Sequence, residues 1–244
     1  MTDELILVGD VGGTHSRWAL FDGELKEITV AKTCASTGLQ QAVEPWLGRF
    51  IAVGVAVAGP VIQGTVSLTN ANWRASEHDL NVPVCLVNDL AAVALSVPVL
   101  ADGDIEWWGG KPTIGGRVLC IGVGTGFGGA LWTGDGVVAM EPGHEDLGAG
   151  FGGLTVEEVV SGMALEDHDD ADQFSAGLLA AVTRLGERLR PDTILFIGGV
   201  VEHRPELFEP LRGLPQSLGR IVHPYPALLG VARAAKASLG MTVG

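Results

Sequence analysis

The stretch GDVGGT, residues 9–14, has a near copy in the second half of the chain, GVGTGFGG, residues 122–129. Each stretch follows an apolar run, residues 5–8 or 118–121, and is itself followed by another apolar run. When Gly13 is aligned with Gly124, further identical pairs follow: Thr14 with Thr125, Ala19 with Ala130, Leu20 with Leu131 and Gly23 with Gly134. The repeat predicts two halves that are built alike and face each other across a cleft.

The chemistry of these two turns favours phosphate as a ligand. A glycine-rich turn leaves backbone N–H groups exposed, and the missing Cβ lets an oxyanion approach the main chain. One such turn alone is more often a structural hairpin. The occurrence of two, with the carboxylate of Asp10 inside the first, indicates a pair of phosphate-binding turns.

The composition limits the classes of partner. The 244-residue chain has 15 Lys and Arg residues against 29 Asp and Glu, which gives a net charge of -14. This length accommodates one or two domains, and two suit the repeat. Strong negative charge opposes binding to nucleic acid or to an anionic membrane, so neither is expected as a partner. A phosphate-rich ligand would instead be bound by backbone donors, helix N-termini and a divalent cation.

The cysteines and the apolar segments indicate the compartment. Cys34, Cys85 and Cys120 include no Cys-x-x-Cys spacing, and two of them lie in apolar runs. They are expected to be buried thiols in a reducing compartment. No basic leader with an apolar segment opens the sequence, and the longest apolar stretch, residues 51–62, is interrupted by glycine and proline. We therefore expect a cytoplasmic protein without a membrane span.

Hydrophobic periodicity and turn residues predict alternating strands and helices. In the first half, strands are expected at residues 5–8, 16–21, 28–32, 51–57 and 84–87, and helices at 39–50 and 90–100. In the second half, strands are expected at 118–123, 130–133, 137–140 and 193–197, helices at 155–160, 175–189 and 228–239, and an acidic surface loop at 166–172. Strands that are apolar on both faces indicate an α/β fold whose ligands gather beyond the strand C-termini, where Asn88 and Asp89 are placed.

Many ordered fragments of the sequence resemble the bacterial glucokinase family, within the superfamily of sugar kinases, actin and Hsp70. The fragments are residues 8–14, 68–70 with Trp73, 87–89, 122–126, Glu141 with Gly143-His144, Glu157 with Ser161-Gly162, Gly198-Gly199, and 221–223 with Pro226 and 228–230. The resemblance implies an α/β fold of two ribonuclease-H-like, actin-like ATPase domains with a cleft between them. The expected domains are residues 1–99 plus 228–244 and residues 100–227.

The same resemblance implies an enzyme that uses ATP to phosphorylate glucose at its 6-hydroxyl, giving glucose 6-phosphate and ADP in the first step of glycolysis. Asp89 would act as the catalytic base and Asp10 would hold Mg²⁺. The residues expected to bind ATP are Gly9, Asp10, Val11, Gly12, Gly13, Thr14, Gly124, Thr125, Gly126, Gly198 and Gly199. The residues expected to bind glucose are Asn88, Asp89, Glu141, His144 and Glu157, because sugar hydroxyls need paired donors and acceptors.

Each of these residues also has a purely structural interpretation. Asp89 could be the N-cap of the helix that follows it, and Asp10 could stabilise its own turn. Gly198-Gly199 could be a simple strand-to-helix turn. A single histidine such as His144 is usually structural, and a helix-surface carboxylate such as Glu157 is usually solvated.

The chain departs from the family pattern in several places. It is shorter than typical members, mainly between His144 and Thr155 and between Gly162 and Arg190, where relatives carry extra helices. Those helices help to form dimer contacts, so the shortening weakens the expectation of a homodimer. Met140 and Pro142 stand where glycines are usual, and His15 replaces the usual asparagine. Because proline fixes φ and lacks an N–H, the loop with Glu141 and His144 is expected to be reshaped.

Motifs of several other protein classes are absent from the sequence or only partly matched by it. Residues 124–129 satisfy the Gly-x-Gly-x-x-Gly pattern of dehydrogenases, but a hairpin is expected after them rather than the required helix. The sequence has no P-loop motif and no zinc-type cysteine cluster, and we expect no N-terminal segment for a DNA-binding helix-turn-helix. The remaining alternatives are a shortened, non-catalytic sugar-binding or regulatory derivative and a kinase for another hexose.

Overall fold

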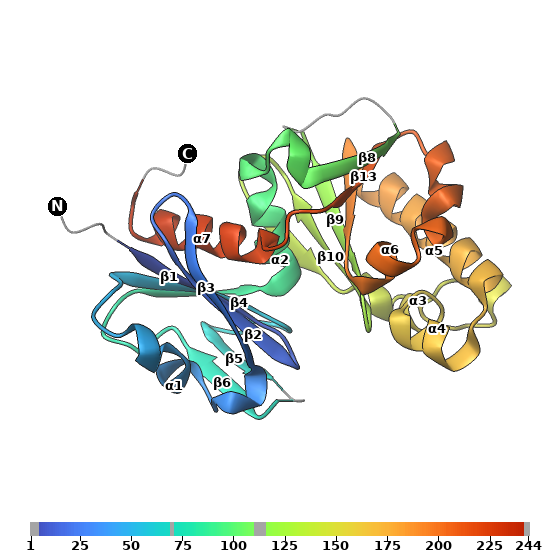
Figure 1. Ribbon diagram of the computed structural model, residues 1–244. Coiled ribbons are helices and arrows are strands. Elements are labelled where there is room, and N and C mark those ends of the chain that lie inside the picture. Colours follow the sequence, from blue (N-terminus) through green and yellow to red (C-terminus); the bar gives the residue numbers. More distant parts are fainter. Residues whose placement is uncertain (1–4, 69–70, 110–115, 242–244) are drawn as a thin grey trace. The chain divides into compact units, whose positions relative to one another are not determined.

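A computed structural model describes residues 5–68, 71–109 and 116–241. Thr69 and Asn70, which belong to the family-like fragment 68–70, lie outside the described residues. The chain forms two compact units (Figure 1): unit 1 comprises Met1–Val99 and Tyr225–Gly244, and unit 2 comprises Leu100–Pro224. Each unit is built around one sheet.

The sheet of unit 1 has the strand order β3-β2-β1-β4-β7. Its strands are β1 (Ile6–Val11), β2 (His15–Phe21), β3 (Leu25–Lys32), β4 (Ala52–Val57) and β7 (Val84–Asn88). The first three are antiparallel, and β1, β4 and β7 run parallel. Every residue of β4 is buried, as expected for a central strand covered on both faces.

Helices and a small hairpin cover the two faces of this sheet (Figure 1). Helices α2 (Asp89–Ser96) and α7 (Pro226–Ser238) pack together on one face. They approach so closely that a Cβ on Gly230 would lie 1.7 Å from the Ala92 carbonyl oxygen, so only glycine fits there. The other face packs against α1 (Leu39–Val43) and the hairpin of β5 (Thr65–Leu68) and β6 (Trp73–Ser76).

Unit 2 repeats this topology. Its sheet has the order β11-β10-β9-β12-β13-β8, with strands β9 (Val118–Val123), β10 (Phe127–Trp132), β11 (Val137–Met140), β12 (Thr193–Ile197), β13 (Ser217–Ile221) and β8 (Ile105–Gly109). Strands β9, β10 and β11 form an antiparallel meander, and β9, β12 and β13 are parallel, as in unit 1. Strand β8 is an addition at the edge. The predicted duplication of an α/β fold is confirmed.

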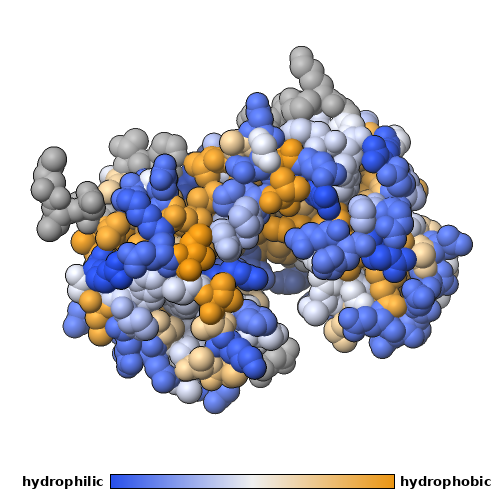
Figure 2. All heavy atoms as spheres, viewed as in Figure 1, coloured by the Kyte–Doolittle hydropathy of each residue, from blue (hydrophilic) through white to orange (hydrophobic). Residues whose placement is uncertain are grey.

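The helices of unit 2 are α3 (Val156–Val159), α4 (Gly162–His168), α5 (Ala171–Leu189) and α6 (Gly199–His203). The buried side of α5 joins a core with β9 and β12 that includes Phe174, Leu178 and Phe196. Hydrophilic residues cover most of the visible surface over these helices (Figure 2), in keeping with the net charge of -14. Across the described residues, no helix combines the length and apolar character needed to cross a bilayer.

Three sequence-based expectations were wrong. The helix expected at residues 39–50 ends at Val43 and gives way to a 3₁₀ turn, Glu44–Trp46, because Pro45 cannot continue an α-helix. The acidic segment 166–172 is not a loop: Ser161 and Asp170 cap α4 and α5, which enclose most of it. Cys34 is exposed rather than buried, whereas Cys85 is half-buried and Cys120 is buried.

Candidate active site

The first glycine-rich turn joins β1 to β2 and is fastened by a residue distant in sequence. The Gly12 N–H donates to the His15 carbonyl at 3.0 Å, which closes the turn. Thr33, which is only 1% exposed, donates its hydroxyl to the Gly12 carbonyl at 2.7 Å and its N–H to the Thr14 carbonyl at 2.9 Å. Thr33 therefore fixes the Gly12 and Thr14 carbonyls of this turn.

The N–H groups of the same turn remain available. Within the described part of the chain, the backbone N–H groups of Gly13 and Thr14 donate to no protein acceptor. Gly13 has no positive φ, and a Cβ there would meet nothing within 4 Å. Neither conformation nor packing among the described residues requires glycine at this position, and the missing Cβ leaves room for a ligand to approach the backbone. Gly9 differs, because a Cβ there would clash with the Trp18 ring at 2.6 Å.

Asp10 is a half-buried carboxylate next to this turn. It lies opposite Arg17 in the β1–β2 ladder, and its Oδ2 is 3.2 Å from Arg17 Nη1. Burial raises the pKa of the Asp10 carboxyl, and the adjacent Arg17 guanidinium opposes that shift. No group of three or more His, Cys, Asp or Glu side chains suited to a metal occurs among the described residues. A single carboxylate fits Mg²⁺ only if the ion brings water and phosphate ligands with it.

Asn88 and Asp89 lie where β7 ends and α2 begins. The N-cap is Asn88: its Oδ1 accepts from the Ala91 N–H at 3.1 Å, and its Nδ2 donates to the Gly59 carbonyl at 3.2 Å. Asp89 is the first helical residue, and its Oδ1 accepts from the Leu90 N–H at 2.8 Å. The capping role considered for Asp89 therefore belongs to Asn88, which keeps one N–H and one lone pair for a ligand.

The register of the parallel strands places Asp10 and the Asn88-Asp89 pair at the same edge of the sheet in unit 1. Asp10 is level with Ala56 of β4, which is level with Val87 of β7, so two strand spacings of about 4.8 Å separate Asp10 from Val87. Carboxyl ends of parallel strands are where α/β sheets bind ligands. Unit 1 thus combines exposed N–H donors and two carboxylates at this edge.

The second turn, between β9 and β10, is fastened from α4. The Gly124 N–H donates to the Gly126 carbonyl at 3.1 Å, and the Gly162 N–H donates to the Gly124 carbonyl at 2.6 Å. A Cβ on Gly162 would lie 2.8 Å from that carbonyl oxygen, so the contact requires glycine. Ser161 precedes it as the buried N-cap of α4. Gly124 resembles Gly13: it has no positive φ, and a Cβ there would meet nothing.

Three of the predicted sugar-binding residues belong to unit 2, and two of them come together. Glu157 Oε1 lies 3.4 Å from His144 Nε2, and Glu157 Oε2 would be 3.3 Å from a Cβ on Gly126. Glu157 therefore joins the second turn to the His144 segment. Glu141 is exposed at the start of a 3₁₀ turn, Pro142–His144, and its carbonyl accepts from the His144 N–H at 3.3 Å. Pro142 is buried in the first turn of that 3₁₀ helix, where its fixed φ fits.

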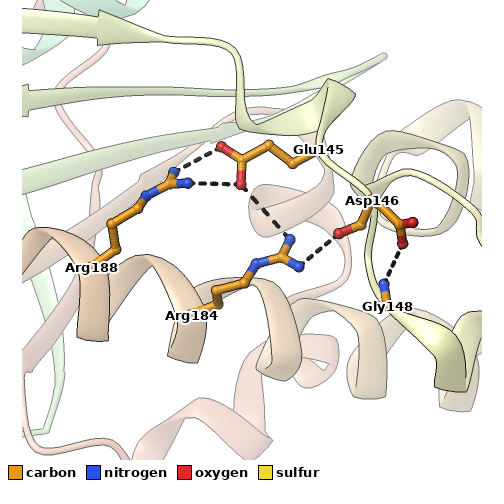
Figure 3. A network of polar contacts seen from close by, with 5 residues as sticks. All are labelled: Glu145, Asp146, Gly148, Arg184 and Arg188. Atoms are coloured by element: carbon orange, nitrogen blue, oxygen red, sulfur yellow. Dashed lines mark hydrogen bonds and ion pairs between the residues drawn. The ribbon is translucent and has the colours of Figure 1, made fainter.

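A network of ion pairs fixes the chain directly after His144 (Figure 3). Arg188 of α5 binds Glu145 through two hydrogen bonds of 2.8 and 3.0 Å, and the pKa of Arg188 is raised by this carboxylate. Arg184, one turn earlier, donates to the Asp146 carbonyl at 2.6 Å. The Val156 N–H donates to the Glu145 carbonyl at 2.9 Å. The segment between His144 and Glu157 is thus held against α5.

A cavity of about 540 Å³ in unit 2 combines the second turn with the Gly198-Gly199 turn. Its lining residues include Gly124, Thr125, Met163 and Gly199. Gly198 has a φ of 116° and would clash with the Val123 carbonyl if it had a Cβ, so the fold itself requires glycine there. Gly199 has neither constraint. A cavity of this volume lies in the range of small-molecule sites.

Sequence reasoning did not assign roles to the residues that fasten the turns. Thr33 carried no signal, because its contact with Gly12 is tertiary. Ser161-Gly162 belonged to the family-like fragments, and a serine before a helical segment does indicate an N-cap, but the contact with Gly124 was not foreseen. The pairing of Arg188 with Glu145 likewise depends on the fold.

Solved structures share this architecture. A glucokinase from an Antarctic psychrotroph has a TM-score of 0.75 at 20% identity, over 96% of this chain and 99% of that one. A ROK family glucokinase from Streptomyces griseus, in complex with glucose and AMPPNP, has a TM-score of 0.69 at 18% identity, over 96% and 99%. At this identity the likeness establishes the fold, which is the actin-like ATPase fold of the sugar kinases.

The sequence comparison is more specific. The family model "Glucokinase" matches residues 7–167, and the chain belongs to the glucokinase family. The glucokinase of Caulobacter sp. (strain K31) is 35% identical over 195 residues, which cover 66% of this chain and 59% of that protein. The glucokinase of Tolumonas auensis is 29% identical over 220 residues, covering 78% and 67%. The chain thus spans about 60% of the length of the Caulobacter relatives that it matches.

Proposed function

We propose that this protein catalyses the ATP-dependent phosphorylation of glucose at its 6-hydroxyl, with Asp89 as the base. The observation that carries the proposal is the placement of Asp89 at the C-terminal end of β7, on the sheet edge that also bears the first turn. Because Asn88 caps α2, the Asp89 carboxylate is not needed as the cap. The family match, residues 7–167, includes both residues.

The two turns would bind the phosphates of ATP. In unit 1 the donors would be the N–H groups of Gly13 and Thr14, and in unit 2 the donor would be the N–H group of Thr125. The adenosine would lie in the cavity beside Gly199. Asp10 would hold Mg²⁺, which would neutralise charge on the phosphates when bound. An acidic chain is suited to this arrangement, because backbone donors and a cation replace basic side chains.

The sugar would be oriented by side chains whose positions are fixed by other contacts. Glu157 can accept hydrogen bonds from two hydroxyls, and His144 next to it offers a ring nitrogen. Asn88 would use its remaining N–H and lone pair. Asp89 would accept the proton of the 6-hydroxyl as that oxygen bonds to phosphorus and the bond to the ADP oxygen breaks.

A coupled assay with glucose, ATP and Mg²⁺ tests the proposal. We expect turnover in the wild-type protein and a fall of about 10² or more in kcat for Asp89→Asn, with glucose affinity by calorimetry within about tenfold. Asp172→Asn is the matched control, because Asp172 also lies in the first turn of a helix but is exposed on α5. Unchanged kcat in Asp89→Asn would refute the role of the base.

The same assay separates the alternatives. Glucose binding without turnover in the wild-type protein would indicate a non-catalytic sugar-binding derivative. A panel of hexoses would show whether another sugar is preferred. We further propose that the reaction occurs in the cytoplasm as the first step of glycolysis, which is supported by three cysteines that form no disulfide.

A further inference from the structure

A second cavity, of about 800 Å³, lies in unit 1 on the outer face of the β5–β6 hairpin. It is lined by the hairpin, by the chain leading into α1 and by the segment after β4: residues Thr37–Gln41, Pro60, Ile62, Thr65–Ser67, Arg74–Ser76 and Asp79. None of these is a predicted glucose or ATP ligand. Its volume lies in the range typical of small-molecule sites.

The alternation of the two strands gives this cavity a polar wall. Val66, Leu68, Trp73 and Ala75 are buried in the core, so the residues between them lie on the opposite face. On that face Ser67 is paired with Arg74, and Thr65 with Ser76. Both Ser67 and Arg74 are exposed. The hairpin therefore presents hydroxyl groups beside a guanidinium group.

Arg74 differs from most arginines of this protein. Among the described residues, its guanidinium has no hydrogen-bond or ion-pair partner, although Asp79 lines the same cavity. Most other arginines bind a carboxylate or a backbone carbonyl: Arg17, Arg49, Arg117, Arg184, Arg188, Arg204, Arg212 and Arg220. In a chain with a net charge of -14, a guanidinium group in a polar cavity that pairs with no described carboxylate is suited to an external anion.

The segment leading into α1 adds a donor of fixed orientation. Gln41 Oε1 accepts from the Thr37 N–H at 3.0 Å and from the Thr37 hydroxyl at 3.4 Å. With its oxygen engaged, the NH₂ group of Gln41 is the part left for a ligand. Asp79 uses Oδ2 to accept from the Ser76 N–H at 2.8 Å, which leaves further acceptor capacity for a hydroxyl.

From these groups we propose that the cavity is a second small-molecule site, which binds the phosphate ester of a sugar. The planar guanidinium of Arg74 would bind two phosphate oxygens, with the Ser67 hydroxyl beside it. Gln41 and Asp79 would bind hydroxyls of the sugar. Binding here does not depend on the proposed phosphoryl transfer. The phosphorylation of glucose would itself release a sugar phosphate ester, and only this point rests on the proposed function.

The test is a titration followed by amide resonances of the hairpin, residues 65–67 and 74–76, with glucose 6-phosphate as the probe. These resonances come from residues that line this cavity, and the comparison with Arg74→Met separates binding here from binding at the predicted active site. We expect saturable shifts in the wild-type protein, weakened at least about tenfold in Arg74→Met, because a charge-assisted hydrogen bond is lost. Ser67→Ala should weaken them less. Glucose should not shift these resonances, and inorganic phosphate should bind more weakly.

The matched control is Arg190→Met, which removes another exposed arginine whose guanidinium has no partner among the described residues. It should bind the probe as the wild-type protein does. The proposal is overturned if glucose 6-phosphate does not shift the hairpin resonances of the wild-type protein. It is also overturned if the hairpin resonances of Arg74→Met shift at the same glucose 6-phosphate concentrations as those of the wild type. Equal affinity for inorganic phosphate would overturn the assignment of a sugar ester. Because Arg74 is exposed, the variants should keep the wild-type melting temperature, which checks that they are folded.

Discussion

The Thr33 hydroxyl should control the conformation of the first glycine-rich turn, and Thr33→Val removes this hydroxyl alone. The substitution replaces the hydroxyl by a methyl group at a site only 1% exposed, while the bond from the Thr33 N–H to the Thr14 carbonyl is kept. The hydroxyl oxygen lies 2.7 Å from the Gly12 carbonyl oxygen. A methyl carbon needs about 3.3 Å or more from an oxygen, so the turn must move by about 0.5 Å.

Two effects of this change can be given magnitudes. The Gly12 carbonyl is half-buried, so water can partly replace the lost donor, and we expect a loss of about 1 kcal/mol in the free energy of unfolding. A shift of about 0.5 Å in the donors of the turn should raise the KM for ATP several-fold, since misplacement by about 1 Å can cost about 10²-fold. Thr33→Ser, which keeps the hydroxyl, should restore most of both values.

Urea unfolding and the coupled kinase assay measure the two effects. The matched control is Thr29→Val on β3, because the Thr29 hydroxyl makes only a long contact of 3.5 Å with the Trp18 carbonyl and is exposed. We expect this control to stay within about 0.5 kcal/mol of the wild type. Equal stability and equal KM in Thr33→Val and Thr29→Val would show that Thr33 does not fasten the turn.

Three other predictions concern single groups. In the wild-type protein, burial raises the pKa of Asp10, so the folded state binds the Asp10 proton more tightly than the unfolded chain does. The wild-type Asp10 therefore lowers the free energy of unfolding as the pH rises above the ordinary pKa of aspartate. Asp10→Asn removes this carboxylate. The melting temperature of Asp10→Asn should therefore match or exceed that of the wild type at neutral pH, with the gap closing below about pH 4, while turnover is lost. A thiol reagent at pH 8 should modify Cys34 first, because burial raises the pKa of Cys85 to about 11 and that of Cys120 to about 12; mass spectrometry showing faster modification of either would contradict this. Gly162→Ala should raise the KM for ATP, because its Cβ would press on the Gly124 carbonyl, and an unchanged KM would remove that contact from the site.

Most strands were predicted from local sequence patterns, and the strands that were missed have identifiable causes. Continuous apolar runs predicted β4 and β9, and the aligned glycines predicted the duplication. The hairpin of β5 and β6 was not predicted, because each strand has only four residues and depends on its partner. The edge strand β8 was also missed, since residues 105–109 show no alternation of apolar and polar residues.

The sequence singled out candidate ligand residues but not the residues that support them. Motif residues such as Asp89 and Glu157 stand in short, ordered fragments, so the sequence alone singled them out. Their supports act across the fold: Asn88 bonds to Gly59, and Glu145 bonds to Arg188. Such pairs have no fixed spacing in sequence, because their distance is set by how strands and helices pack. They become visible only when the chain is folded.

The two turns differ in how they are held, although their sequences are copies. In the first, Val11 is paired with Ser16, and a side-chain hydroxyl from Thr33 binds the turn carbonyl. In the second, Val123 is paired with Phe127, so the turn is one residue tighter, and a backbone N–H at Gly162 binds the carbonyl. Any substitution of Gly162 adds a Cβ that presses on the Gly124 carbonyl, whereas at Thr33 only a substitution that removes the hydroxyl breaks the bond to the Gly12 carbonyl. The first turn should therefore be loosened by loss of the Thr33 hydroxyl, and the second by loss of glycine at position 162.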